Sequence, residues 1–225
     1  MKIHKRTLAT VAIAAASATA QAALQARDSE GSPLPYGDSA AVFYYDTEQN
    51  ITWLRDWNLG LGSSFDSVDG TTDGLMTWAN ASLWANSLTH VGGGWRLPTA
   101  LNADGSGPCQ GYNCPGSEMG ALWFSLGNTA NGGLTHEGPF QSLQGTVAGG
   151  RWTSTEFAHL GTYAYVFYMQ YGLMGDSPKI GADGVRYAVA VRLGDIAPVP
   201  EPSTYASLFL GLGILAIVIK SRRSI

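Results

Sequence analysis

Few residues in this chain could do chemistry, and they are not grouped as an active site requires. Away from the two ends the histidines are His90, His136 and His159, and no acidic residue accompanies them at the spacing of metal ligands. The sequence has no Gly-x-Ser-x-Gly elbow for a nucleophilic serine and no phosphate-binding P-loop. We therefore predict no catalytic residue, no metal site and no cofactor, and a protein that is not an enzyme.

Cys109 and Cys114 are the two cysteines, in the stretch Gly-Pro-Cys-Gln-Gly-Tyr-Asn-Cys-Pro-Gly. An even number of cysteines in an exported chain favours a disulfide, which here would close a small loop. Its contribution to stability should be modest, because a short loop has little entropy to lose. The alternatives are two free thiols or a metal site, which would need a second cysteine pair or a nearby histidine.

Asp66, Asp69 and Asp73 form an acidic stretch that could be considered a calcium loop. Their spacing of three and four residues differs from that of an EF-hand, and the closing glutamate of that motif is missing. We therefore predict a solvated loop built on Asp-Gly turns.

Two segments have the apolar spacing of helices that pack one face on a core. The first covers residues 78–88 and is ended by the glycines at 92–94, and the second starts after Ser117, a candidate N-cap, and closes at Gly127. We expect both apolar faces to be core, not ligand platforms. These faces consist of Trp78, Ala81, Trp84, Ala85 and Leu88, and of Met119, Leu122, Trp123 and Leu126.

Strands are expected both before and after the helices. A hairpin is predicted from residues 41–45 and 51–54 with a polar turn at 46–50, and later strands at 151–156, 163–170 and 186–193. This order predicts an α+β fold with an antiparallel sheet and two helices. The 29 glycines indicate a loop-rich domain.

The N-terminal end has the composition of a secretory signal peptide. Three basic residues within the first six precede an uncharged run at 8–20, and Ala20 and Ala22 form a small-x-small cleavage site. We predict a signal peptide at 1–22, cut after Ala22. An amphipathic surface helix is the alternative, although the run has no polar face beyond serine and threonine.

The C-terminal end joins a proline-rich linker at 196–204 to fifteen uncharged residues at 205–219 and a basic tail at 220–225. As a helix the uncharged run would extend about 22 Å, which is short of a roughly 30 Å hydrocarbon core. Basic side chains after the run can snorkel to the headgroups. We therefore predict a transmembrane helix at 205–219. The basic residues that stop it are Lys220, Arg222 and Arg223.

Both basic clusters should remain on the cytoplasmic side, so the chain between them is expected to be exported. Residues 23–198 hold seven Lys and Arg and sixteen Asp and Glu, a formal charge of −9. Such a charge repels phosphate backbones, so nucleic acid is not expected as a partner. We predict a linker at 23–39 and one exported domain at 40–195.

Pro200, Glu201 and Pro202, followed by an apolar run and a basic cluster, resemble the PEP-CTERM sorting signal. The resemblance implies recognition by an exosortase, a membrane protease or transpeptidase that cuts near these residues and releases or transfers the exported domain to the periplasm, cell surface or exterior. Such systems accompany exopolysaccharide production and biofilm formation. A plain tail anchor with a proline linker is the alternative.

A second resemblance covers residues 40–195 and is to the Lcl-type C-terminal domain, a family of unknown function similar to the C-type-lectin-like fold of formylglycine-generating enzymes. The stretches that carry it are ITWLRD at 51–56, MTWA at 76–79, GWRLPT at 94–99, GSEMG at 116–120, RWTSTE at 151–156 and YAVAVR at 187–192. The catalytic cysteines of those enzymes lie in the C-terminal part of their domain. Cys109 and Cys114 lie near the middle, so the activity does not carry over.

The WRLPT stretch is expected to organise this domain. We expect Trp95 to anchor the core, Arg96 to donate to loop carbonyls or to Glu118 or Glu156, and Pro98 to fix the turn. A functional arginine is the alternative. The complete set of motif residues is Trp95, Arg96, Leu97, Pro98, Thr99, Glu118, Trp152 and Glu156.

Two functions remain open at this point. The first is a non-enzymatic surface or matrix protein that binds exopolysaccharide or a surface protein, with Tyr112, Trp152 and Tyr171 as exposed rings for sugar stacking. The second is an exported enzyme of unrecognised class on the formylglycine-generating scaffold, which would need its acids in one deep pocket. The acids considered are Glu118, Glu137 and Glu156.

Overall fold

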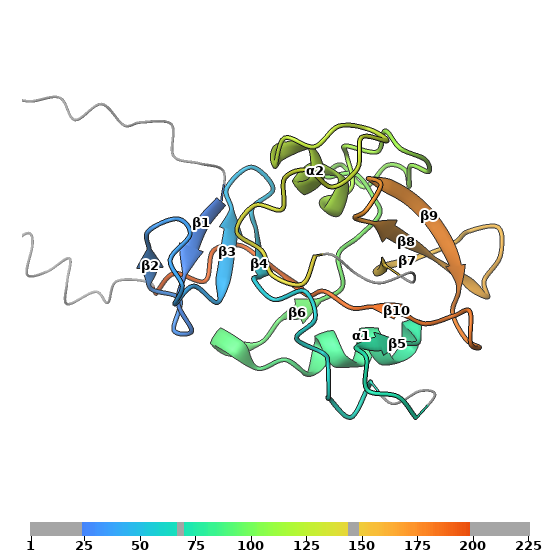
Figure 1. Ribbon diagram of the computed structural model, residues 1–225, viewed down its shortest axis with the longest axis horizontal. Helices are drawn as coiled ribbons and strands as arrows, with labels where there is room; N and C mark the ends of the chain where they lie inside the picture. The colour runs from blue at the N-terminus through green and yellow to red at the C-terminus, as the bar shows by residue number, and fades with distance from the viewer. Residues whose placement is uncertain (1–23, 67–69, 144–148, 199–225) are drawn as a thin grey trace, which may run out of the picture.

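A computed structural model describes residues 24–66, 70–143 and 149–198 of the chain. Within this part the chain forms two sheets and two α-helices, which confirms the predicted α+β class (Figure 1). The helices lie on opposite sides of the sheets, with α2 at the top of the view and α1 at the bottom. The predicted signal peptide at 1–22 and transmembrane helix at 205–219 lie outside the described residues.

The first sheet has six strands in the order β2-β1-β3-β4-β11-β6, and the second has five in the order β5-β10-β7-β8-β9. All pairs are antiparallel except β7 with β10. The first sheet comprises β1 Leu24–Arg27, β2 Pro33–Leu34, β3 Phe43–Asp46, β4 Ile51–Leu54, β6 Trp95–Arg96 and β11 Val191–Leu193. The second comprises β5 Leu75–Met76, β7 Gly150–Glu156, β8 Tyr163–Tyr168, β9 Leu173–Pro178 and β10 Arg186–Tyr187.

The predicted β3–β4 hairpin is confirmed, and its turn chemistry explains it. The Asp46 carboxylate accepts hydrogen bonds from the N–H groups of Glu48 and Gln49, at 2.9 and 3.1 Å. Asn50 takes the left-handed conformation at φ +53°, which asparagine tolerates better than most residues.

The two helices are α1 Trp78–Ser87 and α2 Glu118–Ser125. Ser117 is the N-cap of α2, as predicted, and its hydroxyl accepts from the N–H of Gly120 at 3.1 Å. Helix α1 ends earlier than expected, because Leu88 already has extended backbone and a separate 3₁₀ turn, η1 His90–Gly92, follows it.

The predicted linker at 23–39 is wrong, because this segment contributes two strands to the first sheet. Strand β1 pairs with β3 along its whole length, with Ala26 opposite Tyr44, and Arg27 is buried. The strand has only four residues and includes a glutamine and an arginine, so its sequence has no clear strand pattern.

The predicted single strand at 186–193 is also interrupted. Strand β10 pairs in the second sheet and β11 in the first, and the three buried residues at 188–190 carry the chain between the sheets. Every position from Tyr187 to Val191 is buried, so the alternation of polar and apolar faces does not apply.

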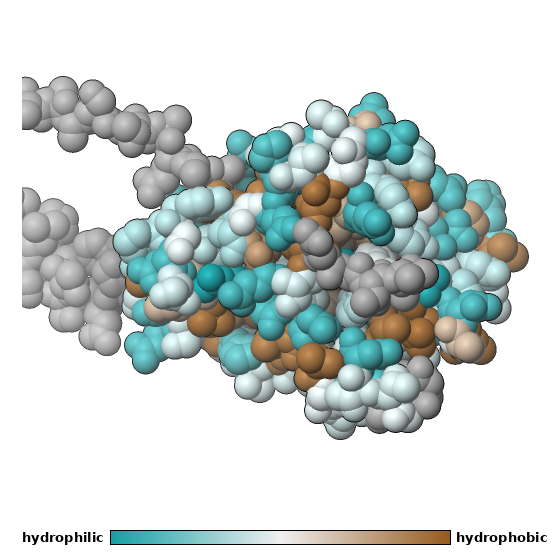
Figure 2. Space-filling model, in the orientation of Figure 1, coloured by the Kyte–Doolittle hydropathy of each residue, from teal (hydrophilic) through white to brown (hydrophobic). Residues whose placement is uncertain are grey.

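Aromatic residues fill the space between these elements. Five tryptophans are essentially inaccessible to solvent, and the apolar faces of both helices pack into the core, as expected. The five are Trp53, Trp57, Trp95, Trp123 and Trp152. On the face of the molecule shown in Figure 2, small apolar patches lie between polar residues. No helix in the described ranges has the length and apolar character needed to cross a bilayer.

Candidate binding site

The WRLPT segment and the start of α2 form a polar network. Arg96 donates to both carboxylate oxygens of Glu118 at 2.8 and 2.6 Å, and the N–H of Thr99 donates to the same carboxylate at 2.7 Å. The hydrogen bond that Arg96 donates to the Glu118 carboxylate raises the pKa of Arg96 despite its partial burial. Arg96 therefore binds Glu118, one of its expected partners, and helps to position the WRLPT segment against the start of α2.

The same segment is fastened to β7. The carbonyl of Pro98 accepts from the N–H of Ser154 at 2.7 Å, and the hydroxyls of Thr99 and Thr155 lie 3.1 Å apart. The RWTSTE and WRLPT stretches, more than 50 residues apart in sequence, thus meet at the N-terminus of α2. The polar groups that the two stretches bring together bind each other, so we assign this network a structural role.

The two motif tryptophans are buried anchors. Trp95 stacks on Phe43 with ring centroids 5.4 Å apart and donates to the carbonyl of His90 at 2.9 Å. Trp152 is fully buried and donates to the carbonyl of Met76 at 2.8 Å. The prediction that Trp152 is an exposed ring for sugar stacking is therefore wrong, because its side chain fills the second sheet's core.

Cys109 and Cys114 are joined in a disulfide, and the loop that it closes lies along strand β9. Gly111 exchanges both backbone hydrogen bonds with Met174, at 2.8 and 2.9 Å, and the Gln110 side chain donates to Asp176 at 2.9 Å. Strand β9 is at the edge of its sheet. The disulfide loop therefore covers part of that edge and satisfies its backbone groups.

Asp66 closes a loop from within. It is 1% exposed, and its two carboxylate oxygens accept from the N–H groups of Gly62 and Gly74 at 2.7 and 2.6 Å. It is thus not the solvated residue that was predicted. Asp69 lies outside the described residues, and nowhere in the described ranges do three His, Cys, Asp or Glu side chains gather as a metal site would require.

A hollow of about 600 Å³ lies beside the turn between β8 and β9. We call it the Tyr171 hollow. Its walls are Asn131, Gly132, Gly133, Leu134, Leu143, Gln170 and Tyr171. Tyr171 is 46% exposed. The hollow thus combines an accessible ring, two amide side chains and two leucines.

The β8–β9 turn orients Tyr171 outward. Met169 is fully buried and the N–H of Tyr171 donates to the carbonyl of Tyr168 at 3.0 Å. Gly172 has φ +63°, and a Cβ at this position would lie 2.5 Å from the Trp123 indole nitrogen. Only glycine fits such a close approach, so the turn is held on the core while the ring of Tyr171 remains outside.

The opposite wall is organised by Asn128, a residue that the sequence reasoning missed. Asn128 is 3% exposed, and its side-chain oxygen accepts from the N–H groups of Thr135 and His136, both at 2.9 Å. Its amide nitrogen donates to the carbonyls of Trp123 and His136 at 3.3 and 2.8 Å. One buried side chain therefore closes the loop that carries residues 131–134.

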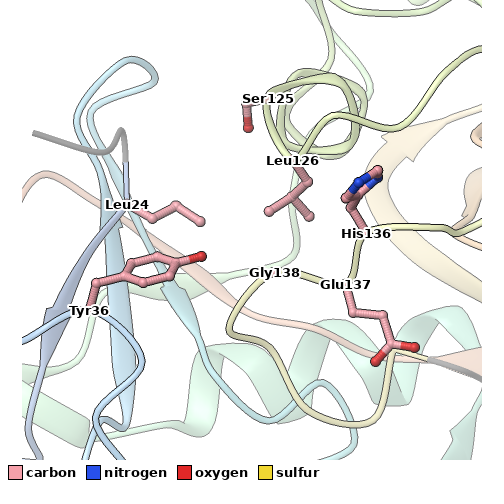
Figure 3. Close-up of a pocket in the computed structure, with 7 residues that line it drawn as sticks. All are labelled: Leu24, Tyr36, Ser125, Leu126, His136, Glu137 and Gly138. Atoms are coloured by element: carbon pink, nitrogen blue, oxygen red, sulfur yellow. The ribbon is translucent and has the colours of Figure 1, made fainter. Parts of the chain in front are cut away.

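A second hollow, of about 420 Å³, lies beside the C-terminal end of α2 and residues 136–138. Figure 3 shows Leu24 and Tyr36 on one side of it and Leu126 and His136 on the other. The remaining lining residues are Ser125, Glu137 and Gly138. It has a smaller volume than the Tyr171 hollow and a carboxylate in its wall.

The three acids considered for an enzyme have three different surroundings. Glu118 is bound to Arg96, Glu156 lies 3.0 Å from the Lys179 ammonium, and Glu137 lines the second hollow. Tyr112, the other ring considered for sugar stacking, is 41% exposed on the disulfide loop and does not line the Tyr171 hollow. The arrangement gives the enzyme alternative no support.

Comparison with known families identifies the C-terminal end of the chain. Residues 198–223 match the PEP-CTERM protein-sorting motif. The motif marks an exported protein that an exosortase processes at the membrane, as the Pro200-Glu201-Pro202 pattern predicted. Neither a curated protein nor a solved structure shows significant similarity to the chain.

Proposed function

We propose that this exosortase substrate is a non-enzymatic binding module that holds exopolysaccharide in the Tyr171 hollow, at the cell surface or in the extracellular matrix. The proposal includes the Lcl-type, C-type-lectin-like interpretation of the exported domain. The contact between the WRLPT and RWTSTE stretches at the start of α2 supports that interpretation. The sorting motif supports export and processing at the membrane, and the hollow is the feature that suggests the binding chemistry.

The observation that carries the proposal is the composition of the hollow around Tyr171. A sugar ring has apolar C–H faces and a rim of hydroxyl groups, so it needs an aromatic surface and convergent hydrogen-bonding groups. Tyr171 offers the aromatic surface, and Asn131 and Gln170 offer amides that can both donate and accept. The formal charge of −9 on residues 23–198 favours a neutral or cationic polysaccharide over an anionic one.

Replacing Tyr171 tests the proposal directly. Tyr171→Ala should weaken binding to exopolysaccharide from the producing bacterium about tenfold, because loss of one aromatic contact costs roughly 1.4 kcal/mol. Tyr171→Phe should keep most of the affinity, since it keeps the ring. Binding can be measured as the retardation of the protein in native gels that contain the polysaccharide.

Tyr112→Ala is the matched control, because it removes a ring of similar exposure that lies outside the hollow. It should leave retardation unchanged. Equal losses in Tyr112→Ala and Tyr171→Ala, or no retardation of the wild-type protein, would contradict the proposed site.

A further inference from the structure

The first strand and the last described residues are locked together. Arg27, 4% exposed, donates to both carboxylate oxygens of Asp195 at 3.0 and 2.6 Å. Ile196 is 5% exposed. Its backbone lies close to Gly31 in the β1–β2 turn: a Cβ added to Gly31 would be 2.1 Å from the carbonyl oxygen of Ile196. The chain is therefore fixed to the β1–β2 turn as far as Ile196.

The Pro-Glu-Pro motif begins only four residues after this anchor, at Pro200. Four residues of extended chain span at most about 14 Å. A compact domain of this size has a radius of gyration of about 16 Å. An enzyme that binds residues 200–202 is thus brought against the part of the domain from which the tail leaves.

That part of the surface is acidic. Glu30 is exposed at the tip of the β1–β2 turn, and the carboxylate of Asp28 accepts hydrogen bonds from the turn's own N–H groups. Asp195 adds a third carboxylate, which is paired with Arg27. In Figure 1, β1 and β2 lie at the opposite end of the molecule from β9.

We infer that the β1–β2 turn, residues 28–32, is a docking surface for the exosortase, which contacts it while processing the tail. The Arg27–Asp195 pair and the buried Ile196 fix the start of the tail on this surface, so the first residue of the motif lies at most about 14 Å from Ile196. The partner surface should carry basic or hydrogen-donating groups that complement Glu30. The inference rests on the sorting motif and is independent of polysaccharide binding.

The test follows conversion of the full-length chain to its processed form by pulse-chase labelling in the producing bacterium. Glu30→Lys should slow conversion about fivefold, because a reversed charge at the edge of an interface slows association. Asp183→Lys makes the same charge change on an exposed residue between β9 and β10 and should leave the rate unchanged. Equal thermal midpoints of the purified full-length proteins exclude a folding defect.

A longer linker between the domain and the sorting motif provides a second test of the inference. Six Gly and Ser residues inserted between Ala197 and Pro198 free the motif from the turn, so Glu30→Lys should cause no further slowing in that background. A Glu30→Lys rate equal to that of Asp183→Lys, or the same fivefold effect with and without the insertion, would overturn the inference. This assay does not depend on polysaccharide binding. A negative result would therefore contradict the docking surface without affecting the Tyr171 proposal, and a negative result in the polysaccharide assay would leave the docking surface unaffected.

Discussion

Arg151 is a buried cation that bonds to carbonyl oxygens. Its guanidinium donates to the carbonyls of Gly149, Ser142 and Leu143 at 2.9, 2.7 and 2.9 Å. It lies over the rings of Trp57 and Tyr187, 5.5 and 5.4 Å from their centroids. Burial lowers its pKa to about 10, which still leaves it charged at neutral pH. Because Leu143 is a wall of the Tyr171 hollow, Arg151 connects the core to the candidate site.

Arg151→Lys should destabilise the protein by about 3 kcal/mol, because lysine lacks the planar fork that reaches several carbonyls at once. The free energy of unfolding in urea measures this loss. Arg192→Lys, on a partly exposed residue, is the control and should change it by less than about 1 kcal/mol. An Arg151→Lys protein as stable as the wild type would show that the carbonyls find other donors.

The disulfide loop shows how one element protects another. Gly111 and Gln110 occupy the free edge of β9, which would otherwise offer unpaired backbone groups to another chain. The covalent bond is thus less important for overall stability than for keeping the loop on this edge.

Replacing Cys109 and Cys114 together by serine should lower the free energy of unfolding by about 2 kcal/mol, as the small loop predicts. The larger change should be local. Hydrogen exchange at the Met174 amide, which donates to Gly111, should accelerate far more than exchange at the Val166 amide in strand β8, which is paired on both sides. Equal acceleration at both amides would mean that the loop has no special role at the edge.

The elements that could be predicted from sequence are those whose causes are local. The turn at 46–50, the cap at Ser117 and the glycine after α2 each depend on neighbouring residues, and each is observed. Strand β1 and the change of sheet at 188–190 depend on partners far along the chain, so periodicity gave no sign of them.

The same distinction holds for the candidate site. The exposure of Tyr171 could be guessed from a ring placed beside a turn glycine. The opposing walls at 131–134 and Leu143 are placed by Asn128 and Arg151 through contacts that sequence spacing does not reveal. For the same reason Trp152 could not be distinguished from an exposed ring before the fold was known.

At the scale of the whole molecule, the described chain begins and ends at the same place. Strand β1 starts two residues after the predicted signal cleavage site, and the chain at 195–198 packs on the β1–β2 turn next to the sorting motif. The folded domain thus uses nearly all of the sequence between the predicted signal peptide and the sorting motif. None of the residues that line the Tyr171 hollow belongs to the β1–β2 turn, so the proposed polysaccharide site and the proposed docking surface are separate.

The stability that the Arg27–Asp195 contact contributes should depend on pH in a defined direction. Partial burial alone would raise the pKa of Asp195, but the hydrogen bonds from Arg27 and from the N–H of Ala197, with the charge of Arg27, outweigh it and lower the pKa below its usual 3.8. A carboxylate with a lowered folded-state pKa contributes stability above its unfolded pKa and loses it as the pH falls through the folded value.

The difference in thermal midpoint between the wild type and Asp195→Asn should therefore be constant from pH 7 to about pH 5 and should shrink below about pH 4. Asp183→Asn, on an exposed residue outside this contact, provides the baseline at each pH. A difference that persists undiminished at pH 2 would mean that the Asp195 contact acts through packing and not through the charge of the carboxylate.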